Sequence, residues 1–129
     1  MKTRNLILIS TLLLFTITSC SPRMVGTWKV TKFETISPGE QNVTLQNIGT
    51  ITFKGNNTGE KELNYQVMGI KRNDVQPFTW STSENYITID SNDSEVAKTW
   101  IFIENKKKRQ VWKSTDGSKK IQSLELEKK

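Results

Sequence analysis

The residues with reactive side chains are few, and their types exclude several kinds of catalytic site. The chain of 129 residues has one cysteine, Cys20, and no histidine. Ser-His-Asp and Cys-His arrangements therefore cannot form, and neither can zinc sites built on histidine or on several cysteines. One cysteine also cannot form a disulfide within the chain. We expect a protein that is not an enzyme and that needs no cofactor.

Acidic residues form two pairs with the spacing of a strand face, Glu60 with Glu62 and Glu125 with Glu127. Paired carboxylates can act as acid and base in glycoside hydrolysis. Alternation with the residue between them predicts instead an outward, solvated row. The oxygen-rich segment from Asp90 to Ser94 lacks the glycine and the distal glutamate of an EF-hand loop, so we expect no metal site.

Aromatic side chains give the first candidate binding site. Trp28, Phe53, Tyr65 and Trp80 each lie on the aligned face of a predicted strand, where they could line a pocket for a small apolar ligand. The alternative is that these rings fill the core. Only 34% of the chain is hydrophobic, and one aromatic side chain can bury about 150–250 Å².

A basic run gives the second candidate site. Lys106, Lys107, Lys108 and Arg109 are consecutive, and residues 106–129 carry a net charge of +6, against −2 for residues 20–105. For an exported protein, such a patch favours anionic lipid headgroups or a polyanionic glycan over nucleic acid. The alternative is a solvated hairpin turn, where lysines also deter aggregation at a sheet edge.

The N-terminus predicts export. Lys2 and Arg4 precede an apolar stretch over residues 6–17, and small residues follow. This is the layout of a secretory signal, and about 12 apolar residues are too few for a membrane-spanning helix of about 20. The four residues Ile17-Thr18-Ser19-Cys20 resemble the lipobox of bacterial lipoproteins.

The lipobox resemblance implies cleavage before Cys20 and acylation of that residue, which anchors the protein to a membrane. Two or more acyl chains anchor stably where one does not. We therefore expect a signal peptide over residues 1–19, a lipidated N-terminus and short tether over 20–24, and one domain over 25–129. Ser21, in the position after the cysteine, favours the outer membrane of a bacterial cell envelope, facing the periplasm.

The rest of the chain predicts an all-β fold. Short runs of alternating apolar residues recur with turn residues between them, which is typical of a barrel or a sandwich. We expect about eight antiparallel strands in an up-and-down barrel, with a β-sandwich as the alternative, and long loops over residues 37–47 and 68–77. Asp116-Gly117 predicts the last hairpin turn. The predicted strands span residues 26–36, 49–54, 60–67, 78–82, 86–90, 97–104, 109–114 and 121–127.

Two of the predicted strands have further features. The aligned positions shift in parity between Val30 and Phe33, which predicts a bulge in the first strand. The strand over 97–104 is apolar on both faces, with Ile101 and Ile103 opposite the aromatic face, so we expect that it is buried on both sides or closes an edge.

The segment Gly26-Thr27-Trp28 resembles the Gly-x-Trp signature of lipocalins. The later pieces Thr52-Phe53, Asn57-Thr58-Gly59, Phe78-Thr79-Trp80 and Tyr86-Ile87-Thr88-Ile89 are similar in order to lipocalin-like domains of small bacterial lipoproteins. The last predicted strand has no arginine to pack over Trp28. The resemblance implies a lipocalin-like barrel, and an eight-stranded barrel has room for side chains alone or for one small ligand.

Two functional hypotheses follow. The chain is a lipid-anchored envelope protein that binds a small apolar ligand or lipid inside its barrel. Alternatively, its core is filled, and its outer surface or its long loops bind a protein or glycan, as in lipoproteins that inhibit lytic enzymes.

Overall fold

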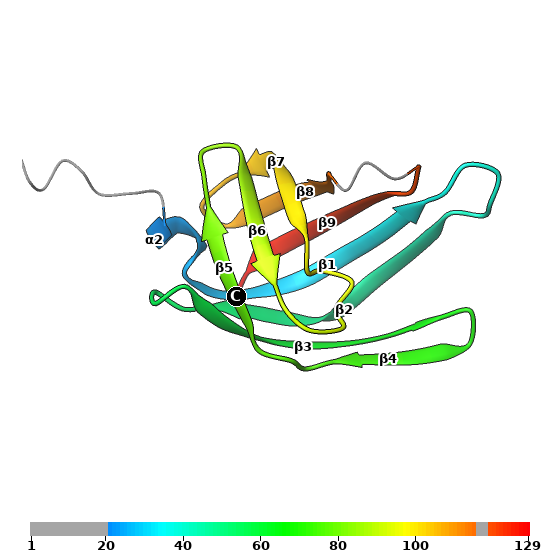
Figure 1. Cartoon of the computed structure of the whole chain (residues 1–129), viewed down its shortest axis with the longest axis horizontal. Coiled ribbons are helices and arrows are strands. Elements are labelled where there is room, and N and C mark those ends of the chain that lie inside the picture. Colours follow the sequence, from blue (N-terminus) through cyan, green and yellow to red (C-terminus); the bar gives the residue numbers. More distant parts are fainter. Residues whose placement is uncertain (1–20, 116–118) are drawn as a thin grey trace, which may run out of the picture.

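The computed structural model describes residues 21–115 and 119–129, and within them it contains one short helix and nine β-strands (Figure 1). Residues 1–20 and the predicted turn at Asp116-Gly117 lie outside these described residues. The elements are α2 (Ser21–Met24), β1 (Gly26–Ile36), β2 (Val43–Phe53), β3 (Thr58–Val67), β4 (Ile70–Asp74), β5 (Phe78–Thr82), β6 (Tyr86–Asp90), β7 (Thr99–Asn105), β8 (Arg109–Ser114) and β9 (Ile121–Lys128).

The strands form one antiparallel sheet that closes on itself. Their order is β2-β1-β9-β8-β7-β6-β5-β3-β4, and an additional pairing of β2 with β3 completes the barrel. Eight strands make the wall, while β4 extends from β3 as a hairpin partner. The structure confirms the predicted eight-stranded antiparallel barrel, and the β-sandwich alternative is wrong.

Two predicted loops contain strand structure. The expected loop over 37–47 ends earlier, because β2 begins at Val43, which pairs with Thr35 of β1. The expected loop over 68–77 contains β4, which folds back on β3 through Met68 and Gly69. Both turn residues have positive φ, at 51° and 80°. Such a two-residue turn fits the twist of a hairpin, but Met-Gly is not a typical turn sequence.

The shift in apolar alternation between Val30 and Phe33 correctly predicted the bulge in β1. The register with both neighbouring strands shifts between Val30 and Lys32, and Phe33 then returns to the core. Burial of β7 on both faces, one of the two alternatives predicted for this strand, is wrong. Its outward residues Ile101 and Ile103 are 45% and 59% exposed, because no second layer covers this wall of the barrel among the described residues.

Two glycines allow close contact between strands. Gly49 has φ +143°, and a Cβ there would lie 1.9 Å from the backbone oxygen of Glu62 on β3. A Cβ on Gly59 would lie 2.2 Å from Cζ of Phe78 on β5. The second contact lies at one of only two residue pairs that join β3 to β5. Glycine is thus required by packing where the barrel closes.

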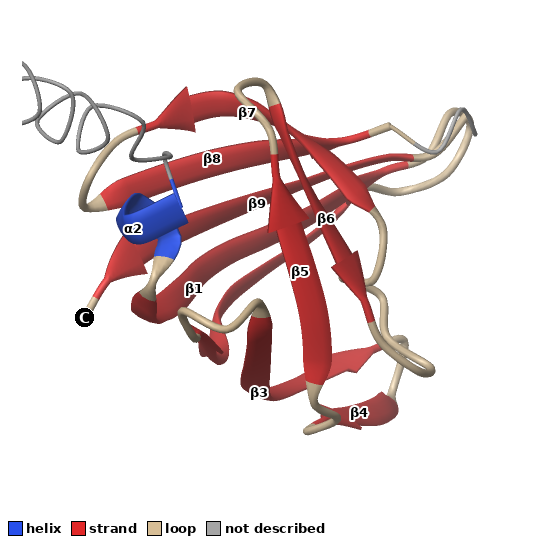
Figure 2. Cartoon of the chain, turned by 60° about the vertical axis from the view of Figure 1, so that its left-hand side comes forward, coloured by secondary structure: helices blue, strands red, loops and turns tan. Residues whose placement is uncertain are grey.

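The barrel has two distinct ends. At the closed end, α2 lies beside the start of β1 and the end of β9, as Figure 2 shows. The β7–β8 turn also lies here, because the Lys128 amide of β9 donates to the carbonyl of Lys108 at 2.9 Å. At the open end lie the β1–β2 and β6–β7 loops. No helix among the described residues is long and apolar enough to span a membrane.

Candidate functional site

Three of the four predicted pocket residues lie in the core, and two of these, Phe53 and Trp80, are in ring contact. Trp28 is 0% exposed, Phe53 1% and Trp80 4%. The Phe53 ring makes edge contacts with Phe78 and Trp80 at 5.3 Å and with Trp112 at 6.2 Å between centroids. An apolar ligand can enter between these rings only by displacing them.

Each indole also has a hydrogen-bond acceptor that fixes its orientation. Trp28 Nε1 donates to the Met24 carbonyl, Trp80 to Thr58 and Trp100 to Val96, each at 2.9 Å. Trp112 donates to the side chain of Gln110 at 3.1 Å. Buried indoles that are satisfied in this way act as structural elements of the core.

The closed end is sealed by α2. Met24 is 2% exposed and belongs to the core cluster, so residues 21–24, predicted as part of a tether, hold a helix against the barrel. The Lys128 ammonium lies 5.4 Å from the Trp28 ring centroid. A cation on the last strand therefore does cover Trp28, and it is a lysine in place of the absent arginine.

The fourth predicted pocket residue, Tyr65, lies apart from the other three, near the open end. Its ring meets Phe33 edge-on at 6.0 Å, and its hydroxyl is hydrogen-bonded to Arg72 of β4. Burial raises the pKa of the Tyr65 phenol above 10.0, and the nearby Glu95 carboxylate adds to this, while the Arg72 hydrogen bond opposes it.

At the open end, where Tyr65 lies, polar side chains cover the core. Gln122 of β9 is 3% exposed, accepts a hydrogen bond from Lys98, and lies 3.4 Å from both Thr35 and Glu95. The β6–β7 loop contributes Glu95 and Lys98, so this loop folds over the mouth of the barrel. The open end is thus lined with hydrogen-bonded polar groups rather than with an apolar entrance.

A buried ion pair, not predicted from the sequence, joins three elements. Lys61 of β3 faces the core, and its Nζ lies 2.5 Å from Oδ1 of Asp74 on β4. Their side chains are 0% and 6% exposed. Ser94 of the β6–β7 loop donates to the other carboxylate oxygen at 2.5 Å. Strand alternation points the side chain of Lys61 into the barrel when those of Glu60 and Glu62 point outward. The sequence therefore contained a signal for a buried lysine.

An open groove lies on the outer wall beside β2 and β3, and we call it the outer groove. Its volume is about 440 Å³, and it is open to solvent. Threonines of β2 and glutamates of β3 face it, because their neighbours along each strand face the core. The chain that follows Asp74 forms its other side. Its residues are Thr50, Thr52, Glu60, Lys61, Glu62, Val75 and Pro77.

The outer groove is acidic. Glu60 is paired with Lys54 at 3.1 Å, whereas Glu62 is exposed and takes part in none of the ion pairs among the described residues. Glu60 and Glu62 lie in the outer groove because their side chains point outward, as predicted. The groove presents carboxylates and threonine hydroxyls to a ligand.

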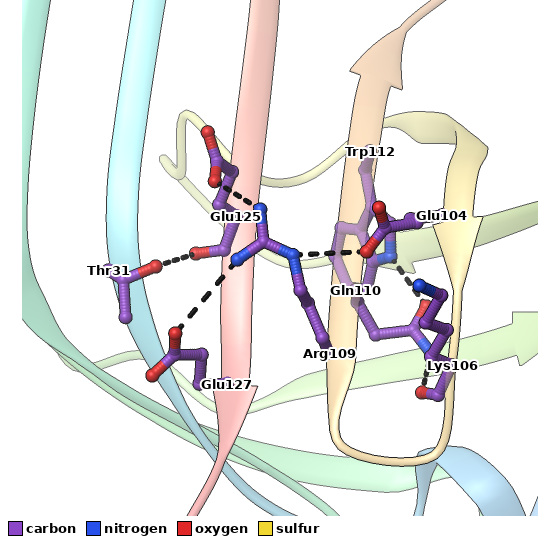
Figure 3. A network of polar contacts seen from close by, with 8 residues as sticks. All are labelled: Thr31, Glu104, Lys106, Arg109, Gln110, Trp112, Glu125 and Glu127. Carbon is purple, nitrogen blue, oxygen red and sulfur yellow. Dashed lines mark hydrogen bonds and ion pairs between the residues drawn. The ribbon is translucent and has the colours of Figure 1, made fainter.

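The basic run divides into two parts. Lys106, Lys107 and Lys108 form the exposed β7–β8 turn. Arg109 instead points to three carboxylates, Glu104 at 3.0 Å, Glu125 at 2.8 Å and Glu127 at 3.9 Å (Figure 3). Its hydrogen bond with Glu125 raises the pKa of the guanidinium. Glu125 and Glu127, the second of the two predicted glutamate pairs, thus form ion pairs with an arginine in the wall of the barrel.

The segment from Asp90 to Ser94 is likewise used within the fold. Ser94 binds Asp74, and the Asp93 carboxylate lies 3.8 Å from Arg72. Within residues 21–115 and 119–129, no three histidine, cysteine or acidic side chains are grouped so that they could hold a metal ion.

Comparisons with known proteins agree with this architecture. The profile of the lipocalin-like domain family matches residues 24–108. No curated protein matches the chain. Among solved structures, a redesigned β-barrel is similar, with 11% identity and a TM-score of 0.50 over 88% of this chain and 97% of that one. That likeness supports the barrel fold alone. On the family profile, which covers most of its length, this chain belongs to the lipocalin-like domain family.

Proposed function

We propose that this protein is a lipid-anchored binding protein of the bacterial cell envelope, without enzymatic activity, that holds its ligand in the outer groove. One contrast carries the proposal. The aromatic interior is packed and its indoles are hydrogen-bonded, whereas the outer groove is open and has polar and charged walls. A lipocalin-like barrel is a fold that generally binds ligands, and here the outer wall offers the accessible site.

The chemistry of the groove defines the ligand class. Glu62 and the threonine hydroxyls suit a partner that brings cationic groups or hydrogen-bond donors, while Val75 and Pro77 add apolar contact. A basic protein segment or an amino-bearing glycan fits this description. The small apolar ligand of the first hypothesis fits it poorly, because burying an unpaired carboxylate against an apolar ligand is unfavourable.

The groove can be tested in cells with a photoreactive diazirine side chain at Thr50. We expect discrete crosslinked products that disappear when Glu62→Lys reverses the charge of the groove. The matched control is Glu84→Lys, which makes the same charge change on the exposed β5–β6 turn and should leave the products intact. A probe at the exposed Ser81 of β5 should give none of these products. Identical products at Thr50 and Ser81, or products that persist in Glu62→Lys, would overturn the proposed groove.

The anchor is tested separately. We expect mass spectrometry of the protein extracted from membranes to give a chain that begins at Cys20 and carries acyl groups on it. The Cys20→Ser variant should keep its first 19 residues. An unmodified Cys20 in the membrane-extracted protein would refute lipid anchoring.

A further inference from the structure

Six basic residues gather at the closed end of the barrel, and we call them the basic end: Arg23, Lys106, Lys107, Lys108, Lys128 and Lys129. Hydrogen bonds join α2, the β7–β8 turn and the end of β9 here. Arg23 donates to the Asn105 carbonyl at 3.1 Å, and Lys128 Nζ donates to the Arg23 carbonyl at 3.4 Å. The six residues are therefore neighbours in space although they span more than 100 positions.

The charge of the basic end is not neutralised by the surrounding carboxylates. None of the ion pairs found within the described part of the chain involves any of the six. The nearest acids along the sequence, Glu104 and Glu127, both point to Arg109. Glu84, exposed on the β5–β6 turn, is an acidic residue of a turn at this end.

An exposed apolar group lies on the wall beside the basic end. Tyr86 of β6 pairs with Ile101 of β7, and Ile103 lies two residues further toward the β7–β8 turn. They are 47%, 45% and 59% exposed. Lysines next to an exposed tyrosine and isoleucines are the composition of surfaces that bind the headgroup region of a membrane.

The position of the predicted lipid attachment adds the deciding constraint. Cys20 immediately precedes α2, which lies at the closed end. A short lipid anchor there brings this end, rather than the open end, close to the bilayer. Each lysine or arginine near an anionic leaflet raises the affinity of the protein for that surface by roughly fivefold.

We infer that the basic end rests on anionic lipid headgroups and orients the barrel, so that its open end points away from the membrane. This inference rests on the proposed lipid at Cys20. The three turn lysines alone give a preference of roughly 100-fold for this orientation. The basic end is thus an orienting surface, distinct from the outer groove.

The orientation can be measured by NMR on the acylated protein in nanodiscs that contain gadolinium-chelated headgroups. In discs with anionic phosphatidylglycerol, we expect the amides of residues 106–108 to broaden severalfold more than those of residues 37–42 at the open end. In zwitterionic discs, or at 1 M salt where the Debye length falls to about 3 Å, this difference should fall severalfold, to the level that the anchor at Cys20 gives alone.

Two triple variants separate the basic end from net charge. Replacing Lys106, Lys107 and Lys108 by glutamate should reduce the preferential broadening to the level seen in zwitterionic discs. Replacing Lys71, Lys113 and Lys119, which are exposed elsewhere, changes the net charge equally and should preserve it. Both variants should keep the four indole resonances of the folded protein.

The outcomes distinguish this inference from the anchor proposal. Equal broadening at both ends in the anionic discs, with protein and disc still eluting together at 1 M salt, overturns the orientation and leaves the anchor standing. A difference of the same size in zwitterionic discs overturns the role of anionic headgroups. Protein that separates from the discs at 1 M salt is held there by charge and not by an inserted lipid, and both proposals then fail.

Discussion

Replacing Asp74 by asparagine should destabilise the barrel strongly, because it leaves the Lys61 ammonium buried without its counter-charge. The two side chains are 0% and 6% exposed and lie 2.5 Å apart. Removing one partner of such a pair typically costs about 3–5 kcal/mol. With a urea slope of about 1–3 kcal/mol per molar, that lowers the urea midpoint by about 1–5 M.

Urea unfolding followed by tryptophan fluorescence measures this change, since four tryptophans lie in the core. The control is Asp90→Asn on the exposed face of β6, which should change stability by less than about 0.5 kcal/mol. The double variant Lys61→Met with Asp74→Leu should be less destabilised than the sum of its single variants, with a coupling of about 1–3 kcal/mol. A loss below about 1 kcal/mol for Asp74→Asn, or additive single effects, would refute a buried ion pair here.

Two further predictions test other parts of the fold. Gly59→Ala should cost about 1–3 kcal/mol in urea unfolding, because its Cβ meets the Phe78 ring, whereas Gly55→Ala, with open space around it, should be near neutral; equal effects would contradict the packing argument. The raised pKa of Tyr65 means that unfolding releases a proton above pH 10, so stability is full below pH 10 and declines as the pH rises through the folded pKa. Tyr65→Phe should make that alkaline decline smaller, as thermal unfolding between pH 8 and 11 can show, and an unchanged decline would exclude Tyr65 as its source.

The sequence predicted the barrel well because its signal is local. Strand alternation placed the eight wall strands, and the parity change before Phe33 located the bulge in β1. β4 was missed because Ile70-Lys71-Arg72-Asn73-Asp74 has no apolar alternation, and within the described part of the chain it pairs with β3 alone. The exposed face of β7 was missed because an apolar strand pattern does not reveal whether a second layer covers it.

The candidate sites were harder to predict, because they depend on residues that are distant in the sequence. Lys106 to Arg109 form one basic run, yet strand register directs Arg109 to Glu125 and Glu127 and leaves only the lysines free of these carboxylates. Similarly, the outer groove needs the chain after β4 to lie beside β2 and β3. Neither relation can be read from local composition.

The central claim is that ligands bind outside a packed barrel. A fluorescence titration of the acylated protein with hexadecanoic acid, haem and cholesterol tests it directly, because the four buried indoles report on any molecule that enters the core. We predict no saturable change in tryptophan emission with any of the three. Saturable quenching with a stoichiometry of one ligand per chain would contradict the claim and place the site among Trp28, Phe53 and Trp80.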